Sequence, residues 1–224
     1  GNPSRDDRYW NFEEKRIYEA AHVSKGINFD KYDDIPVETT GGQGTEQPLD
    51  SFGEIGEKFH LPEELAANLE RMNYDKPTPV QKYSIPAAMV GTDVMVSAQT
   101  GSGKTAAFLV PIVATTLRDG PQEPNSEAVA PTSVILAPTR ELCQQIGQEA
   151  KRFCFRTNAR AVEVYGGADA GTQLRDLAQG ADIVIATPGR LEDFLGRGVI
   201  SMSRVKNLVL DEADRMLDMG FEPQ

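Results

Sequence analysis

Short runs of aliphatic and β-branched residues alternate with longer segments of helical periodicity along most of the chain. Five of these runs are predicted strands: residues 93–97, 133–137, 161–165, 183–186 and 207–210. Each is mostly apolar and is followed by a helical pattern, which is typical of a parallel sheet with helices on both faces. The pattern therefore predicts an α/β fold whose ligands bind beyond the carboxyl ends of the strands.

Helix-start signals lie before the first run. Leu65, Leu69 and Met72 recur at the spacing of one helix face after a start at residues 61–64. Further predicted elements are a helix with Thr78 as N-cap and Pro79 in its first turn that ends before Gly91, a helix through residues 141–153, and a surface loop over residues 119–131.

The first 50 residues differ from the rest. They are charged, contain few aliphatic runs and end in a glycine-rich stretch at residues 39–44. This composition is typical of flexible linkers. We predict an N-terminal extension over residues 1–50 and one compact domain over residues 51–224, with Phe52 near its start.

Composition limits the class of protein. The net charge of −11 and pI near 4.7 argue against a nucleic-acid partner, although a local groove can still be basic. No apolar run is long enough to cross a bilayer, and no secretory signal is visible, so no membrane partner is expected. Cys143 and Cys154 are predicted to be free thiols in a reducing, cytoplasmic compartment.

Residues 98–105 read Ala-Gln-Thr-Gly-Ser-Gly-Lys-Thr, between a predicted strand and a helical pattern that opens at Ala106. This is the phosphate-loop pattern, with Ala98 in place of its first glycine. Glycines let backbone N–H groups curl around phosphate oxygens, while the lysine reaches the β- and γ-phosphates and the threonine hydroxyl ligates Mg²⁺. The predicted nucleotide-binding residues are Gln99, Thr100, Gly101, Ser102, Gly103, Lys104 and Thr105.

Asp211 and Glu212 follow the apolar run at residues 207–210. Asp211 is predicted to hold Mg²⁺ opposite Thr105, and Glu212 to orient or deprotonate the water that attacks the γ-phosphate. Alone, such a pair is more often a helix-capping turn than a catalytic pair. Beside a phosphate loop, the pair predicts an NTPase whose catalytic residues are Lys104, Asp211 and Glu212.

Several short motifs occur in one order: Lys76-Pro77-Thr78-Pro79-Val80-Gln81, the phosphate loop, Pro138-Thr139-Arg140-Glu141-Leu142, Gly166-Gly167, Thr187-Pro188-Gly189-Arg190-Leu191 and Asp211-Glu212-Ala213-Asp214. This order resembles that of the DEAD-box ATP-dependent RNA helicases and covers roughly residues 52–224. Residues 26–38, 165–167 and 215–221 are similar to the Vasa/Belle-type subgroup. The resemblance implies a RecA-like P-loop NTPase fold, of which this chain is the first lobe.

The same resemblance implies that Tyr74, Lys76 and Gln81 bind the adenine nucleotide. The Gln81 amide can pair with the N6 amine and N7 of adenine, and the Tyr74 ring can stack on the base. Packing between two helices is the alternative role for Tyr74. The family also has an upstream aromatic residue. Phe52 is its match but lies farther from Gln81 than usual, and Phe59 competes for the role.

RNA contacts are expected at two helix starts and one glycine pair. Thr139 and Thr187 stand at predicted N-caps, where backbone N–H groups and the neighbouring Arg140 and Arg190 can hold backbone phosphates. No aromatic pattern marks base stacking, so the predicted binding is independent of RNA sequence. The expected RNA-binding residues are Pro138, Thr139, Arg140, Gly166, Gly167, Thr187, Pro188, Gly189 and Arg190.

Ala213 and Asp214 are implied to couple ATP to RNA through a Ser-Ala-Thr motif and a second RecA-like lobe, both missing from this chain. We therefore expect ATP and Mg²⁺ to bind but the chain alone to be nearly inactive. The subgroup implies duplex unwinding and mRNP remodelling with translation-initiation or RNA-granule proteins, in the cytoplasm with nuclear shuttling. The alternatives are a non-catalytic module that binds RNA or partner proteins, disfavoured by the intact Lys104 and Glu212, and a DNA helicase, disfavoured by Gln81 and Ala213.

Overall fold

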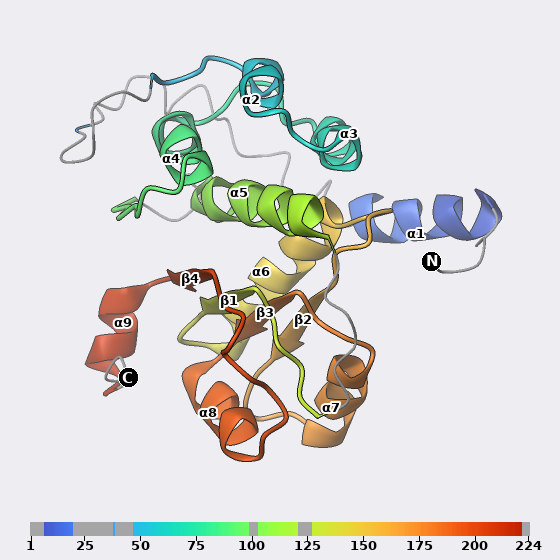
Figure 1. Cartoon of the computed structure of the whole chain (residues 1–224), viewed down its shortest axis with the longest axis vertical. Coiled ribbons are helices and arrows are strands. Elements are labelled where there is room, and N and C mark those ends of the chain that lie inside the picture. The colour runs from blue at the N-terminus through green and yellow to red at the C-terminus, as the bar shows by residue number, and fades with distance from the viewer. Residues whose placement is uncertain (1–6, 20–37, 39–46, 99–102, 121–126, 221–224) are drawn as a thin grey trace. The chain divides into compact units, whose positions relative to one another are not determined.

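The computed structural model describes residues 7–19, 38, 47–98, 103–120 and 127–220. Its contacts divide the chain into two compact units, Gly1–Ala114 and Thr115–Gln224. Figure 1 labels the helices and strands of both units.

The described part of the first unit is helical. It comprises α1 (Asp7–Glu19), α2 (Phe52–Phe59), α3 (Glu63–Arg71), α4 (Pro79–Met89) and the start of α5 (Lys104–Asp119). Phe52, Ile55, Leu65, Leu69 and Ile85 are buried between these helices. The predicted helices after residue 61 and after Thr78 are confirmed as α3 and α4, and α5 begins two residues before the predicted Ala106.

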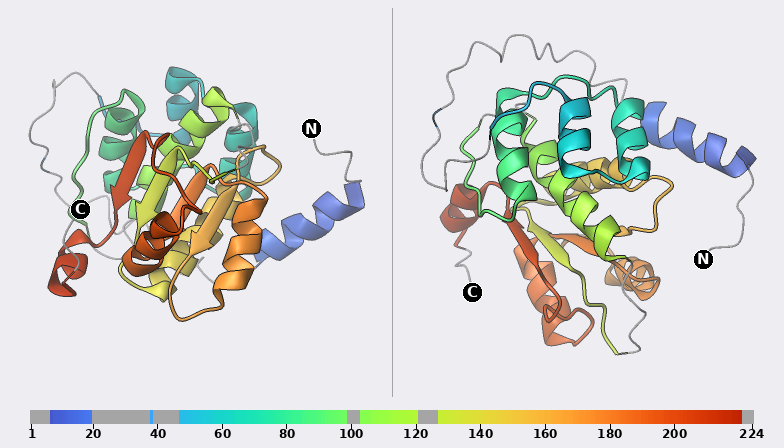
Figure 2. Two further views of the ribbon diagram at one scale, coloured as in Figure 1. Left: turned by 60° about the horizontal axis from the view of Figure 1, so that its bottom comes forward. Right: turned by 45° about the horizontal axis from the view of Figure 1, so that its top comes forward.

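Helix α1 lies within the predicted N-terminal extension, in a segment for which no helix was expected. Several of the contacts that hold the helix are polar. Arg16 pairs with Glu13 one turn earlier at 2.6 Å, the Tyr18 hydroxyl donates to Asn68 Oδ1 at 3.2 Å, and Glu14 pairs with Arg71 at 3.5 Å. In the right-hand view of Figure 2, one end of α1 meets α3, which supplies Asn68 and Arg71. Hydrophobic periodicity does not reveal such a helix.

The predicted strand at residues 93–97 is also wrong. The segment has no regular structure, and Met95 is 98% exposed. A strand forms only where neighbouring backbone groups complete its hydrogen bonds. All strands that pair within the described part of the chain belong to the second unit, so β-propensity alone does not place residues 93–97 in a sheet.

The second unit contains a four-stranded sheet that confirms the other predicted strands. Its strands are β1 (Ser133–Leu136), β2 (Ala161–Val164), β3 (Ile183–Ala186) and β4 (Asn207–Leu210), in the order β2-β3-β1-β4. All three pairings are parallel, and the two views of Figure 2 show the strands side by side.

Helices cover both faces of this sheet, as predicted. On one face, Val134, Val162 and Val184 pack with Leu177 of α7 (Ala170–Ala178) and Phe194 of α8 (Pro188–Gly196). The other face meets α6 (Arg140–Phe153), as Figure 1 shows. The last described helix is α9 (Ala213–Asp218).

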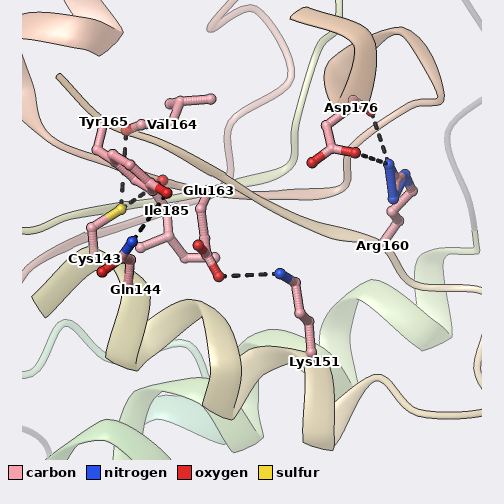
Figure 3. Close-up of polar contacts among 9 residues, drawn as sticks. All are labelled: Cys143, Gln144, Lys151, Arg160, Glu163, Val164, Tyr165, Asp176 and Ile185. Carbon is pink, nitrogen blue, oxygen red and sulfur yellow. Dashed lines mark hydrogen bonds and ion pairs between the residues drawn. The ribbon is translucent and has the colours of Figure 1, made fainter. Parts of the chain in front are cut away.

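Both cysteines are buried and free, which confirms the predicted thiols. The Cys143 thiol lies between α6 and the sheet and donates to the Ile185 carbonyl at 3.3 Å (Figure 3). Burial, and secondarily the charge of Glu163, raise the pKa of Cys143 to about 12. Burial raises the pKa of Cys154 to about 12 as well. Such thiols stay protonated at neutral pH and are poor nucleophiles.

Glu163 places a carboxylate on the sheet face that α6 covers. Its side chain packs against α6 at Gly147. Its Oε1 lies 3.2 Å from the Lys151 Nζ (Figure 3). A Cβ built on Gly147 would overlap three side-chain atoms of Glu163. Glycine at residue 147 is therefore required by the close approach of the carboxylate.

We expect Gly147→Ala to destabilise the protein by about 1–3 kcal/mol, because the methyl group displaces a packed side chain. The control is Gly196→Ala on α8, where a Cβ meets nothing within 4 Å. That change should be neutral or stabilising by up to about 1 kcal/mol. Urea denaturation measures both. The explanation fails if Gly147→Ala costs as much in a Glu163→Ala background as in the unmodified chain.

Candidate functional site

The N-terminus of α4 is built as a reciprocal cap. The Thr78 hydroxyl accepts from the Gln81 N–H at 3.4 Å, and the Gln81 Oε1 accepts from the Thr78 N–H at 2.9 Å. The Gln81 Nε2 donates to the Gly103 carbonyl at 3.1 Å. Gln81 is 1% exposed, so its amide joins the helix cap to the end of the phosphate loop. These bonds use one lone pair and one N–H, and a glutamine amide has two of each.

Tyr74 and Phe52 form an aromatic pair beside this cap. Their ring centroids lie 5.3 Å apart with planes at 77°, and Phe52 is buried. With Leu61 and Leu69 they line a cavity of about 400 Å³. Phe59 lies instead under the Lys58 ammonium, 5.3 Å from its ring centroid. Phe52 is thus the ring that contacts Tyr74. Stacking of Tyr74 on a base stays a prediction.

Of the phosphate loop, Gln99, Thr100, Gly101 and Ser102 lie outside the described residues. Gly103 has a φ of +82°, and Lys104 and Thr105 form the first turn of α5. A Cβ on Gly103 would lie 2.9 Å from the Thr78 hydroxyl and overlap the Gln81 amide. Gly103 therefore satisfies two demands, a left-handed backbone and a close approach to α4. Lys76 lies just before the cap, between Tyr74 and Thr78.

The other predicted motifs share one edge of the sheet. Strand pairing puts Leu136, Val164, Ala186 and Leu210 in one row, at the carboxyl end of each strand. Backbone bonds continue for one residue beyond that row: Ala137 N–H to Ala186 at 2.9 Å, Thr187 N–H to Val164 at 3.0 Å, and Asp211 N–H to Leu136 at 2.9 Å. The segments that begin at Pro138, Tyr165, Thr187 and Asp211 are therefore neighbours.

At the end of β4, Asp211 is 4% exposed and its Oδ1 accepts from the Glu212 N–H at 3.0 Å. Glu212 has φ 51° and ψ 49°, a left-handed conformation that is unfavourable for a residue with a side chain. Its carboxylate pairs with Arg215 at 3.3 Å. Ala213 and the exposed Asp214 begin α9. A strained acidic turn at the carboxyl end of a strand fits a functional position.

The donor set fits Mg²⁺ rather than an ion held by protein alone. Among the described residues, no group of three or more histidine, cysteine, aspartate or glutamate side chains could hold a metal. Mg²⁺ typically takes one or two carboxylates and completes its shell with water and phosphate oxygens. Asp211, buried at the end of β4, would supply a carboxylate of this kind.

Thr139 and Thr187 are N-caps, as predicted. The Thr139 hydroxyl accepts from the Leu142 N–H at 3.3 Å at the start of α6. Thr187 caps α8 without a side-chain bond to that helix, and its hydroxyl accepts from the Gly166 N–H at 3.2 Å. The second threonine therefore joins the α8 start, with Pro188 and Gly189 in its first turn, to the glycine loop.

Both predicted arginines hold the same loop. Arg140 Nη1 donates to the Gly167 carbonyl at 3.1 Å, and its guanidinium lies 5.2 Å from the Tyr165 ring centroid. Arg190 Nη2 donates to the Ala168 carbonyl at 3.2 Å. The structure thus brings Arg140, Gly166, Gly167, Thr187 and Arg190 into one network, with Pro138 and Thr139 at the adjacent end of β1.

Sequence reasoning missed two glutamines in this network. Gln144 donates to the Tyr165 hydroxyl at 3.1 Å, and Gln173 bonds both backbone groups of Tyr165. Gln173 stands one helical turn before Leu177, on the buried stripe of α7. A polar residue within an apolar stripe is the signal that could have revealed it.

Comparison with known proteins agrees with this arrangement. The family model described as DEAD/DEAH box helicase matches residues 78–224, which include every motif at the sheet edge and the α4 cap. The chain belongs to the DEAD/DEAH box helicase family. The parallel sheet with helices on both faces is thus the RecA-like lobe of this family.

Several solved structures share the fold. The yeast DEAD-box splicing factor Prp28 has 33% identity and a TM-score of 0.72, over 98% of this chain and 46% of that one. The RNA helicase Prp28 from Chaetomium thermophilum, bound to ADP, has 33% identity and a TM-score of 0.70, over 98% and 48%. A hypothetical ATP-dependent RNA helicase from Sulfolobus tokodaii has 35% identity and a TM-score of 0.63, over 72% and 44%. The chain thus spans less than half the length of each.

Within the described ranges, no helix is long and apolar enough to span a bilayer.

The contact between Gly103 and the Gln81 amide predicts a difference between two alanine substitutions. Gly91 has φ +85° and open space around its Cβ position, whereas Gly103 has φ +82° and is crowded. Gly91→Ala should cost about 1–2 kcal/mol of stability through backbone strain alone. Gly103→Ala should cost about 1–3 kcal/mol more, because it also displaces Gln81 and breaks the cap. Equal losses in urea denaturation would contradict the contact.

Proposed function

We propose that this chain is the ATP-binding half of an RNA-stimulated ATPase that unwinds short RNA duplexes. The observation that supports the proposal is the shared sheet edge, where the acidic turn at Asp211 adjoins the capped helix starts and the glycine loop. Groups suited to metal-bound phosphate and to polynucleotide phosphate are thus parts of one rigid row. ATP state and RNA binding can be coupled through such a row without a long-range pathway.

The chemistry divides among the predicted residues. Lys104 would neutralise the β- and γ-phosphates, Thr105 and Asp211 would hold Mg²⁺, and Glu212 would orient the attacking water. Gln81 retains one N–H and one lone pair beyond its bonds to Thr78 and Gly103, the two groups that the N6 and N7 edge of adenine requires. This supports ATP as the nucleotide, with Tyr74 and Lys76 at the base. Mg²⁺ would offset the charge of the phosphates during transfer.

RNA would bind along its backbone. The N–H groups at the starts of α6 and α8 point beyond the sheet edge, where positive helix ends attract phosphate. The arginines contribute charge there, although the whole chain carries a net −11. Helix N-termini and arginines of this kind support binding that is independent of RNA sequence.

We further propose that the complete protein has a second RecA-like lobe, which Ala213 and Asp214 contact and which supplies arginine fingers. Loss of an arginine finger lowers phosphoryl-transfer rates by about 10³–10⁵-fold, so the chain alone should be nearly inactive. Residues 26–38, outside the described residues apart from Glu38, support the Vasa/Belle-type subgroup. That assignment proposes mRNP remodelling in translation initiation or RNA granules, in the cytoplasm with nuclear shuttling.

Lys104→Ala tests the nucleotide site. Mg-ATP at about 100 times its Kd should stabilise the unmodified chain by about 2.7 kcal/mol, and the variant should show no such gain. The control is Lys58→Ala, which removes an exposed lysine from α2. Thermal unfolding with and without Mg-ATP measures the gain. Equal stabilisation of the Lys104→Ala variant and the unmodified chain would overturn the proposed role of the loop.

A further inference from the structure

The end of β2 leaves the backbone of one residue without a strand partner. Among the strands of the described residues, β2 lies at the sheet edge and pairs with β3 alone. In a strand, the N–H and C=O of one residue point to the same side and those of the next residue to the opposite side. The Val164 carbonyl points toward β3, where it accepts from Thr187, so both groups of Tyr165 point away from the sheet.

The Gln173 side chain takes the place of the absent strand. Its Oε1 accepts from the Tyr165 N–H at 3.1 Å, and its Nε2 donates to the Tyr165 carbonyl at 2.9 Å. One side-chain amide thus satisfies both backbone groups of Tyr165. Gln173 comes from α7 and is 6% exposed, so water competes little for these bonds.

The same amide also holds an arginine from a third element. Gln173 Oε1 accepts from Arg190 Nη1 at 3.2 Å, while Arg190 Nη2 reaches the Ala168 carbonyl at 3.2 Å. The guanidinium lies 5.5 Å from the ring centroid of Phe194, one turn along α8. Two of the five N–H groups of Arg190 are thus used to fix its plane.

We propose that Gln173 is a positioning residue that fixes the glycine loop at residues 165–168 and the Arg190 guanidinium in the arrangement that receives an RNA phosphate. This inference rests on the proposed RNA-binding function. Gln173 does not touch the phosphate; it sets where Arg190 and the Gly166-Gly167 backbone lie before RNA arrives. Pre-organisation of this kind raises affinity because less ordering remains to be done on binding.

Only an amide meets all three demands. Leucine at residue 173 would leave the Tyr165 N–H and C=O and one Arg190 N–H without their partner. Glutamate would keep both acceptor bonds but has no donor for the Tyr165 carbonyl, so two oxygens would face each other. The substitution Gln173→Leu therefore removes all three hydrogen bonds, whereas Gln173→Glu removes only the bond to the Tyr165 carbonyl.

The test measures binding of a fluorescently labelled single-stranded RNA to this chain at fixed salt. Gln173→Leu should weaken binding at least fivefold, and Gln173→Glu should weaken it at least twofold more than its control. The controls are Gln179→Leu and Gln179→Glu, which make the same changes at an exposed residue at the end of α7. Stabilisation by Mg-ATP should be unchanged in all four variants, which separates positioning from loss of fold.

Two further measurements test whether Gln173 acts through the Tyr165 backbone and through Arg190. Amide hydrogen exchange of Tyr165 in the free chain should be faster in Gln173→Leu but not in Gln173→Glu, which retains the acceptor. In an Arg190→Ala background, Gln173→Leu should weaken RNA binding by a smaller factor than in the unmodified chain, because only the bonds to the Tyr165 backbone remain to be lost. RNA affinity within twofold of the unmodified chain in Gln173→Leu, or an equal loss in Gln179→Leu, would overturn the inference. No RNA binding by the unmodified chain would instead overturn the proposed function and this inference with it.

Discussion

Parallel pairing of four short strands in one register is the constraint on which the site depends. Because Leu136, Val164, Ala186 and Leu210 occupy one row, every segment that follows a strand leaves the sheet at the same edge. The row is fixed from both sides by packed apolar layers, with α6 on one face and α7 and α8 on the other. A shift of one residue in any strand would exchange its two faces and bury the wrong side chains. The position of the functional loops is therefore determined by core packing.

Beyond the row, side-chain hydrogen bonds hold the backbone in place of strand pairing. Arg140, Gln173 and Arg190 each bond a backbone group of residues 165–168, and Thr187 bonds the Gly166 N–H. The two arginines, first interpreted as phosphate ligands, are therefore also part of the scaffold of this loop. An arginine held by carbonyl oxygens keeps its full charge, since a carbonyl accepts hydrogen bonds without neutralising it. Both roles can belong to the same side chain.

The motifs and the sheet could be predicted because each rests on local chemistry. Alternating apolar strands and capped helices identified β1 to β4, α4 and α6, and the motif order identified the helicase family. The features that could not be predicted have physical causes. Residues 93–97 have β-propensity, but a strand requires a partner that propensity does not specify. Helix α1 makes polar contacts with Asn68 and Arg71, which are distant in sequence. Gln173 is one polar residue in an apolar stripe, and only the fold shows which backbone it meets.

The most direct test of the account is to map where RNA binds on the sheet. Single-stranded RNA would be titrated into the isotopically labelled chain while backbone amide resonances are followed. The account predicts the largest shifts at Thr139, Gly166, Gly167 and Thr187, at the carboxyl edge, and no shift at Thr132, Asp182 and Lys206, at the amino edge. Shifts confined to the amino edge, or spread equally over both edges, would contradict it.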